Sequence, residues 1–211
     1  MRLTDLAQRG MPMVQVIRHL EGLAVDSVRT DEAAGGALAM RHTLSCGHRR
    51  IAVLSGPQSS SASAARCAGY LAALNDAGAA PFRLIECPLT GAAGYDMAVA
   101  LLSAPDRPDA IVCGNDLIAL GAIDAVMDAG LSVPKDVAVI GYDDMAFASA
   151  RPVALTTVHQ PLQAMGATAI ALLSQRMREP RQSAQTIILP QHLAIRRSCG
   201  ARHKDTTHDL I

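Results

Sequence analysis

The sequence contains 211 residues, which is enough for one large domain or two small ones with a substantial hydrophobic core. Its 19 Lys and Arg residues balance 19 Asp and Glu residues, so the composition lacks the basic excess typical of a nucleic-acid-binding chain. Half of the residues are hydrophobic, only 2% are aromatic, and Trp is absent. Ala, Leu and Val are therefore expected to build the core.

The cysteine content argues against a disulfide framework or a zinc site. The five cysteines are Cys46, Cys67, Cys87, Cys113 and Cys199, an odd number with no Cys-x-x-Cys spacing. The N-terminus has no apolar segment of the kind found in secretory signals, and no apolar stretch reaches the roughly 18 residues of a membrane span. We expect a cytoplasmic protein that does not insert into a membrane.

Hydrophobic periodicity and turn residues predict alternating strands and helices in chain order. Helices are predicted for residues 4–10, 33–44, 64–77, 92–103, 116–129 and 161–172, with Asp31 as the cap of the second. Strands are predicted for residues 13–17, 25–28, 51–55, 82–87, 109–113, 137–140, 156–158, 187–189 and 193–195. The serine-rich segment 59–63 is predicted as a loop, and the tail 199–211 as polar and frayed.

The alternation predicts an α/β fold with a doubly wound parallel sheet. Residues 30–158, together with 190–198, are expected to form one complete subdomain. Residues 1–29 and 159–189 do not continue this alternation of strands and helices and are expected to form part of a second subdomain. The chain would then cross between the two near residues 30, 158 and 190.

Polar residues follow three of the short apolar strands at the point where each ends. Ser55-Gly56 follows the first, Gly114-Asn115-Asp116 the second, and Gly141-Tyr142-Asp143-Asp144 the third. In open α/β sheets, ligands bind beyond the carboxyl ends of the strands. The sequence therefore predicts a binding site along this edge.

A series of short motifs follows along the chain. The motifs are Gly47-His48-Arg49-Arg50-Ile51-Ala52, Arg66-Cys67-Ala68-Gly69-Tyr70, Pro108-Asp109-Ala110-Ile111, Asn115-Asp116, Val133-Pro134-Lys135-Asp136-Val137-Ala138-Val139-Ile140-Gly141-Tyr142-Asp143-Asp144, Leu155-Thr156-Thr157-Val158 and Gln160-Pro161. In their order and spacing, these motifs resemble those of the LacI-type (lactose-repressor family) transcriptional regulators, from about residue 10 to about residue 198.

This resemblance implies a type I periplasmic-binding-protein-like effector domain with two α/β subdomains and three crossovers. A small-molecule effector, often a sugar or a related metabolite, would bind between them, and no cofactor is implied. In the family, a helix-turn-helix headpiece reads an operator as a dimer. The chain matches neither that headpiece nor the first half of the N-terminal subdomain. We therefore expect a segment of a homodimeric regulator that does not bind DNA specifically by itself. Its second sheet would have an uncovered edge, which predicts low stability as a monomer.

The resemblance also implies that Arg66, Asn115, Asp143 and Gln160 contact the ligand. The Arg66 guanidinium could donate paired hydrogen bonds to a diol or carboxylate, or be a solvated helix residue. Asn115 suits a helix N-cap as well as a ligand contact. Asp143 would accept hydrogen bonds from the ligand, whereas Asp144 is expected to hold turn amides. Adjacent strand residues point to opposite sides, which disfavours a metal shared by the two carboxylates.

Three further positions bear on the chemistry of the ligand. Ser60 is a weaker ligand-binding candidate in a loop of small residues. Ile17 stands where the family pattern usually carries an acidic residue, and Leu89 where an aromatic ring often stacks on the ligand. Because sugar recognition uses such groups, these changes count against a sugar effector or favour a more apolar ligand.

Two other classes of function fit the same fold. One is a periplasmic-type sugar-binding protein of a transporter. The other is an enzyme, although no nucleophile elbow, phosphate-binding loop, dinucleotide motif or His-Glu-x-x-His sequence is present. His48 precedes its strand and is expected to be structural, and His42, His159 and His192 form no pair at i, i+4 that would bind a metal. We therefore expect a binding function without catalysis or a bound metal.

Overall fold

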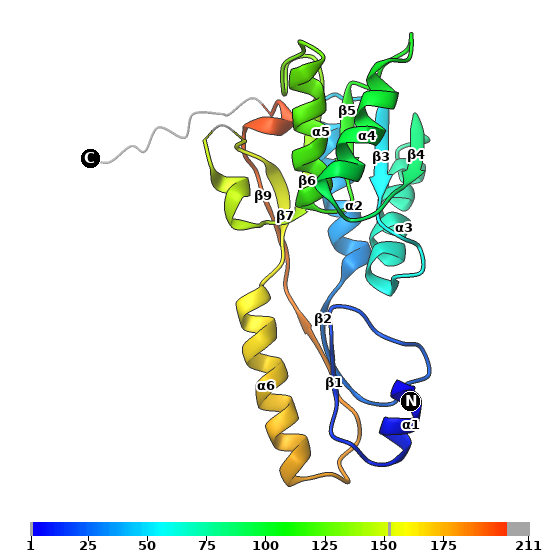
Figure 1. The fold of residues 1–211 in the computed structure, drawn as a ribbon, viewed down its shortest axis with the longest axis vertical. Coiled ribbons are helices and arrows are strands. Elements are labelled where there is room, and N and C mark those ends of the chain that lie inside the picture. The colour runs from blue at the N-terminus through cyan, green and yellow to red at the C-terminus, as the bar shows by residue number, and fades with distance from the viewer. Residues whose placement is uncertain (1, 152, 202–211) are drawn as a thin grey trace, which may run out of the picture.

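Two separate sheets organise the chain, and each forms the centre of one lobe (Figure 1). The computed structural model describes residues 2–151 and 153–201. Within these residues the larger sheet has the order β4-β3-β5-β6-β7-β9 and the smaller sheet the order β1-β2-β8. The strands of the larger sheet are β3 (Ile51–Ser55), β4 (Arg83–Glu86), β5 (Ala110–Cys113), β6 (Ala138–Asp143), β7 (Thr156–His159) and β9 (His192–Ala194). Those of the smaller sheet are β1 (Val14–Val16), β2 (Asp26–Thr30) and β8 (Thr186–Leu189).

Helices connect the strands, and polar caps fix where several of them begin. The helices are α1 (Leu3–Gln8), α2 (Glu32–Ser45), α3 (Ser61–Asp76), α4 (Gly91–Leu102), α5 (Asp116–Asp128) and α6 (Leu162–Arg178), with short 3-10 helices η1 (Ala146–Ser149) and η2 (Arg197–Cys199). The predicted Asp31 cap is confirmed, because its carboxylate accepts a hydrogen bond of 2.9 Å from the Ala34 amide.

Alternating side chains of the central strands bury both faces of the larger sheet. On β3, Ile51 and Val53 pack into the cluster that includes residues of α2 and α3. Ala52 and Leu54 pack into the opposite cluster, which includes residues of α4 and α5. Strands buried on both faces are typical of parallel sheets covered by helices. The predicted α/β fold is confirmed, with β9 as an antiparallel edge strand.

Close helix pairs cover each face of the larger sheet, and small residues allow the close approach. A Cβ added at Gly69 of α3 would overlap the carbonyl oxygen of Ala33 on α2. On the other face, a Cβ at Gly121 of α5 would overlap the carbonyl oxygen of Gly91 on α4. The close packing of α3 on α2 at Gly69 also brings together two residues, one from each helix, that form a buried ion pair.

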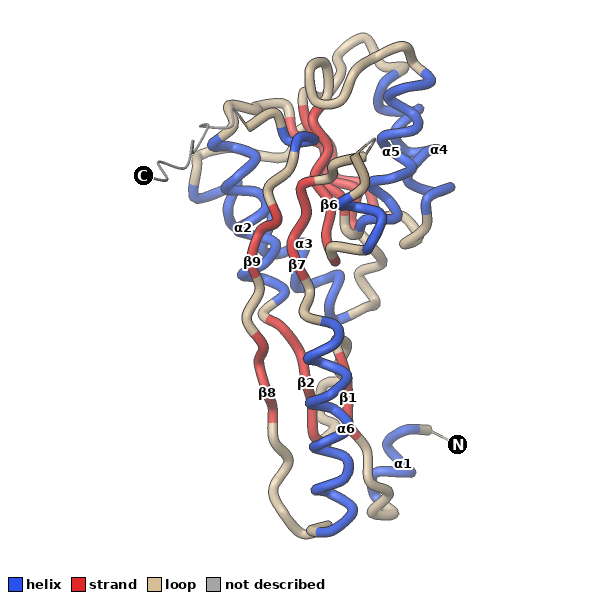
Figure 2. Tube along the Cα trace, turned by 90° about the vertical axis from the view of Figure 1, so that its left-hand side faces the viewer, coloured by secondary structure: helices blue, strands red, loops and turns tan. Residues whose placement is uncertain are grey.

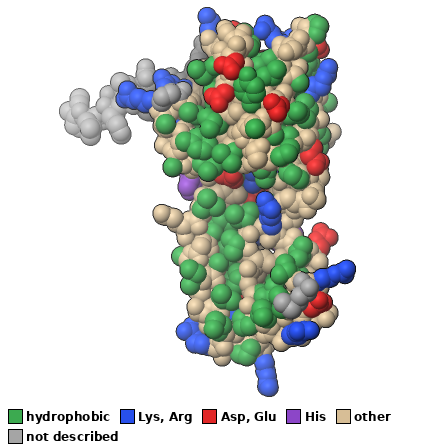
Figure 3. Space-filling model, in the orientation of Figure 1, with side chains coloured by type: hydrophobic (Ala, Val, Ile, Leu, Met, Phe, Trp, Pro, Cys, Tyr) green, Lys and Arg blue, Asp and Glu red, His purple; other side chains and the backbone are tan. Residues whose placement is uncertain are grey.

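The smaller lobe has a thin core under a single long helix. α6 lies along the smaller sheet (Figure 2), and Met165 and Leu172 pack against Val28 of β2. An ion pair of 2.8 Å between Arg176 and the buried Asp26 ties the end of α6 to the sheet. This lobe also carries hydrophobic side chains on its surface (Figure 3). The large exposed ones are Leu3, Met11, Val16, Leu20, Leu162, Ile170, Met177 and Ile188.

Three segments connect the lobes: the step from β2 to α2, the step from β7 to α6, and the step from β8 to β9 (Figures 1 and 2). They place Thr30, Gln160 and Pro190 at the junction. Residues far apart in sequence therefore meet between the lobes.

Some predicted boundaries are wrong by a few residues. α3 begins at Ser61 and not at residue 64, because Ser60 has the extended backbone of an N-cap and the following small residues are helical. β6 continues to Asp143, and α6 continues to Arg178. Cys199 is fully buried against the larger lobe, so the predicted frayed tail does not begin there. The rest of that prediction, residues 202–211, lies outside the described residues.

Within the described part of the chain, no helix combines the length and the hydropathy required to cross a bilayer.

Candidate functional site

The residues that the sequence singled out converge on one cavity of 370 Å³ at the junction of the lobes. Its lining includes all six predicted ligand-binding residues: Ser60, Arg66, Leu89, Asn115, Asp143 and Gln160. The smaller lobe contributes Val16, Ile17 and Arg18. The cavity is therefore built from the strand ends of the larger sheet on one side and the end of β1 on the other.

Arg66 is the most constrained side chain of this cavity. Its Nε and Nη2 donate hydrogen bonds of 3.1 and 2.8 Å to Glu32 Oε2, and its Nη1 donates to the carbonyl oxygen of Gly114. The guanidinium also lies 3.5 Å from the centroid of the Tyr142 ring. Only 7% of the side chain is exposed, so the interpretation as a solvated helix residue is wrong.

Glu32 is the partner that sequence reasoning missed. Its Oε1 accepts hydrogen bonds from Gln160 Nε2 at 2.8 Å and from Thr30 Oγ1 at 3.1 Å. The only local sign of its role is its position directly after the Asp31 cap, where acidic residues are common for helix-dipole reasons alone. Gln160 thus lines the cavity while its side chain is held by Glu32 at the crossover from β7 to α6, and its contact with a ligand stays a prediction.

Asn115 serves as a cap and still presents a donor. Its Oδ1 accepts a hydrogen bond of 2.9 Å from the Ile118 amide at the start of α5. Among the described residues, no hydrogen bond engages its Nδ2 group. The cap interpretation is therefore correct, and the remaining amide group can donate to a molecule in the cavity.

Asp143 supplies the carboxylate of the cavity. Its Oδ1 lies 3.8 Å from Arg66 Nη1, and its backbone has a positive φ of 111°. Burial raises the pKa of Asp143 to about 7, against the opposing effect of Arg66 and with added repulsion from Asp116 and Glu32. Near neutral pH this group can therefore either accept or donate a hydrogen bond.

Asp144 points away from Asp143 and has a structural role, but not the one expected. It accepts a hydrogen bond of 2.7 Å from Arg196 Nη2 and lies 2.9 Å from the His159 ring nitrogen. The turn amide, that of Met145, is held instead by Asp116 at 2.7 Å. Burial raises the pKa of Asp116 to about 6, although hydrogen bonds from Thr157 and Met145 oppose that rise. The two adjacent carboxylates therefore have different partners, Arg66 for Asp143 and Arg196 for Asp144.

Ser60 and two apolar residues complete the lining. The Ser60 Oγ is buried and has no hydrogen-bond partner within the described residues. A buried hydroxyl without a partner is costly, which suits a position that meets a ligand. Leu89 and Ile17 provide apolar contact surface, and Ile17 adopts a positive φ of 65°, which a β-branched residue rarely does.

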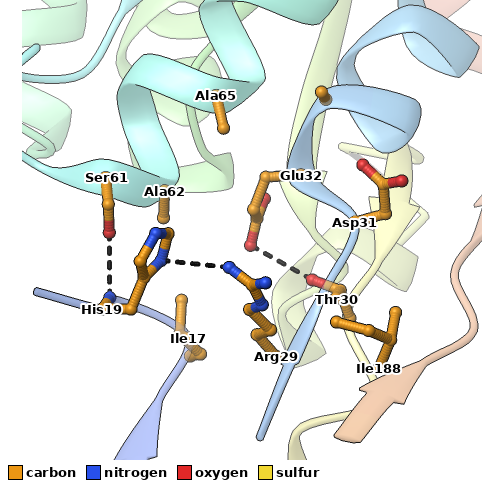
Figure 4. A pocket seen from close by; sticks show the side chains of 11 residues that line it. Ile17, His19, Arg29, Thr30, Asp31, Glu32, Ser61, Ala62, Ala65 and Ile188 are labelled. Atoms are coloured by element: carbon orange, nitrogen blue, oxygen red, sulfur yellow. Dashed lines mark hydrogen bonds between the residues drawn. The ribbon is translucent and has the colours of Figure 1, made fainter. Parts of the chain in front are cut away.

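A second cavity of 360 Å³ adjoins the first and shares Ile17 and Ala62 with it (Figure 4). In this cavity the His19 amide of the smaller lobe donates a hydrogen bond of 2.9 Å to Ser61 Oγ at the start of α3. Arg29 Nη1 lies 3.4 Å from the His19 ring, and Arg29 Nε is buried without a partner among the described residues. Glu32 faces this cavity while its partner Arg66 lines the first.

Two α/β lobes joined by three crossing segments, with a polar cavity at the junction, define a two-lobed small-molecule-binding fold. Known proteins with this architecture match the chain. Residues 40–199 match the periplasmic binding protein-like domain family. The chain belongs to that family, and its resemblance is to the effector-binding domain of LacI-type transcriptional regulators.

Individual relatives agree with this assignment. The HTH-type transcriptional repressor PurR of Edwardsiella ictaluri is 39% identical over 175 residues, covering 82% of this chain and 51% of that protein. A transcriptional regulator CelR–cellobiose complex superimposes with a TM-score of 0.84 at 35% identity, over 92% of this chain and 60% of that one. A LacI family regulator from Enterococcus faecium with bound ribose gives 0.81 at 32% identity, over 92% and 72%. The chain spans about half the length of the PurR relative.

Proposed function

We propose that this chain is the ligand-sensing portion of a LacI-type transcriptional regulator and binds a small molecule between its lobes. The observation that carries the proposal is the convergence of Ser60, Arg66, Asn115, Asp143 and Gln160 on one 370 Å³ cavity lined by both lobes. These residues come from five separate points of the sequence. Arg66 and Gln160 are held by Glu32 and Asn115 caps α5, but the Ser60 hydroxyl and the Asn115 Nδ2 group have no partner among the described residues, as expected of polar groups that meet a ligand.

The lining defines the chemistry of the ligand. Asn115 Nδ2 and Ser60 Oγ are available hydrogen-bond donors, and Asp143 is the carboxylate that meets hydroxyl or N–H groups. Three of the five N–H groups of Arg66 are engaged by Glu32 and Gly114, which leaves two for a ligand. Leu89 and Ile17 add apolar contact. A small, polar and largely uncharged metabolite, a sugar or a related compound, fits this arrangement.

Ligand binding would act through the relation between the lobes. A molecule that contacts Asn115 on one side and Ile17 on the other binds the closed arrangement more tightly and shifts the population toward it. The Glu32, Gln160 and Thr30 hydrogen bonds lie at two of the three crossings, so they couple the cavity to the hinge. In a whole regulator, this change would alter the placement of DNA-binding heads.

The other features of the proposal follow from the relatives. PurR is a transcriptional repressor, which supports a regulator over a transporter component and over an enzyme. We accordingly propose that the whole regulator is a cytoplasmic homodimer that reaches DNA only through a helix-turn-helix headpiece, not through the residues of this chain. The exposed Leu162, Ile170 and Met177 of α6 give the smaller lobe apolar surface for contact with other protein.

The test is a calorimetric and thermal-shift screen of the chain against pentoses, hexoses, disaccharides, nucleosides and purine bases. We expect one class to bind and to raise the melting temperature. Asn115→Ser and Asp143→Asn should each weaken that binding, whereas Asp96→Asn, an exposed control on α4, should not. A ligand whose affinity is unchanged by both cavity variants would refute the site.

A further inference from the structure

Three side chains with soft or borderline donor atoms meet at the end of α2, outside the interlobe cavities. His42 and Cys46 lie four residues apart, so they share one face of the last helical turn. Cys199 of η2 packs against them. His42 Nε2 lies 3.3 Å from Cys199 Sγ and 3.5 Å from Cys46 Sγ, and all three donor atoms lie within 4.8 Å of one another.

These distances match those between ligands of a tetrahedral zinc ion. Bonds of about 2.3 Å to sulfur and about 2.0–2.1 Å to nitrogen place neighbouring nitrogen and sulfur ligands roughly 3.5 Å apart. The same ring nitrogen of His42 faces both sulfurs, as one lone pair directed at a shared ion requires. Both cysteines are free thiols in the structure.

The surroundings hold Cys199 in place and leave the cluster accessible. Cys199 is fully buried, and its carbonyl oxygen lies 2.9 Å from His48 Nε2. Thr156 and Ser198 hydrogen-bond across the same segment at 2.8 Å. His42 and Cys46 are partly exposed, so an ion can enter from solvent.

We propose that His42, Cys46 and Cys199 form a zinc-binding site with a fourth position open to water or an external ligand. Cysteine spacing along the chain predicts no such site, because Cys199 joins the cluster only through the fold. Bound zinc would link η2 to the end of α2 and so stabilise the packing of η2 on the larger lobe. Because a cation that binds only the folded state stabilises it by mass action, zinc should raise the melting temperature of the chain. This site is independent of the interlobe ligand.

The proposal is tested on the full 211-residue chain, reduced and freed of metal, by titration with Zn²⁺ against a chromogenic chelator. We expect a single zinc ion per chain. His42→Asn and Cys46→Ser should each weaken binding by more than about 10-fold and abolish the zinc-dependent thermal shift. Cys67→Ala, at a buried cysteine outside the cluster, is the matched control and should bind as the wild type does.

Two further measurements distinguish zinc bound at this cluster from zinc bound elsewhere on the chain. Co²⁺ should give sulfur-to-cobalt charge-transfer bands in the wild type that Cys46→Ser weakens, and Zn²⁺ should protect Cys46 from alkylation. These readouts avoid Cys199→Ser, which would alter a fully buried position. The proposal fails if zinc does not bind, or if His42→Asn and Cys46→Ser retain the affinity. It also fails if binding is lost only when His203 or His208, near the end of the sequence, is substituted.

Discussion

Arg66 donates two hydrogen bonds to the same oxygen of Glu32, from Nη2 at 2.8 Å and from Nε at 3.1 Å. The side chains are only 7% and 5% exposed. The pair joins α3, which lines the ligand cavity, to the first turn of α2, which directly follows a crossing between the lobes. Glu32 also accepts a hydrogen bond from Gln160, which lies on the segment between β7 and α6. One carboxylate therefore connects the cavity to two of the three segments that join the lobes.

Removing the charge of Glu32 should therefore destabilise the chain. In Glu32→Gln the buried Arg66 loses its closest counter-ion while the shape of the side chain is kept. We expect a loss of about 3 kcal/mol in the free energy of unfolding, because a buried charge left unpaired is costly. Urea denaturation measures this change.

The control for that experiment is Arg41→Gln, which removes an exposed ion pair. Arg41 and Asp76 lie 3.9 Å apart with side chains 64% and 66% exposed. Such a surface pair contributes at most about 1 kcal/mol, and usually less. Equal effects of the two substitutions would contradict the importance assigned to Glu32.

Packing of α3 on α2 should tolerate no added methyl group at Gly69. The Cβ of Gly69→Ala would overlap the Ala33 carbonyl oxygen, which is backbone and cannot move aside without separating the helices. We expect a loss of about 2 kcal/mol or more and weaker ligand binding. Gly166→Ala on α6 is the opposite case, since nothing lies within 4 Å of the added Cβ. That variant should gain up to about 1 kcal/mol from helix propensity.

Substitutions of Asn115 should separate its two roles. Asn115→Ala removes both the cap and the Nδ2 donor, and should cost about 1 kcal/mol of stability along with ligand affinity. Asn115→Ser keeps a capping oxygen, so its stability should stay within about 0.5 kcal/mol of the wild type. Its ligand affinity should nevertheless fall about 5- to 100-fold, the usual consequence of losing a buried hydrogen bond. If Asn115→Ser binds ligand normally, Asn115 is a cap only.

The carboxyl group of Asp143 should make stability depend on pH. The pKa of this group is about 7 in the folded chain, against an ordinary value of 3.8. Between these values the folded state binds more protons than the unfolded state, so the contribution to stability is lost as pH rises from about 4 to about 7. Asp143→Asn should remove that slope, and its stability relative to the wild type should increase toward pH 8. Asp116 titrates in both proteins, and because its charge also raises the pKa of Asp143, the comparison reports Asp143 together with its interaction with Asp116.

Urea midpoints of the wild type and Asp143→Asn between pH 4.5 and 8 measure this difference, with Asp96→Asn as the exposed control. Ligand affinity should change in the opposite direction, rising through pH 7 as Asp143 ionises and becomes a better acceptor. Parallel pH profiles of the wild type and Asp143→Asn would contradict the assignment of the raised pKa to this residue.

Local pattern was enough to predict most of the elements. The apolar runs ending at Ser55, Cys113 and Ile140 are central strands because continuous β-branched sequence is stable only when both faces are covered. The caps at Asp31 and Asn115 depend on amides three residues away, so they too are visible in sequence. The predicted ligand residues other than Ser60 were found through their resemblance to a family, and the structure brings all six to one cavity.

Long-range packing decided the remainder. Nothing near Arg66 in sequence indicates that Glu32 is its partner, because the two are 34 residues apart and meet only through the close packing of α2 on α3. Gln160 reaches the same carboxylate across 128 residues, and Cys199 reaches His42 across 157. A strand or a cap is determined by neighbours along the chain, whereas a shared hydrogen-bond partner or ligand set depends on how distant elements dock, and only the folded structure specifies that.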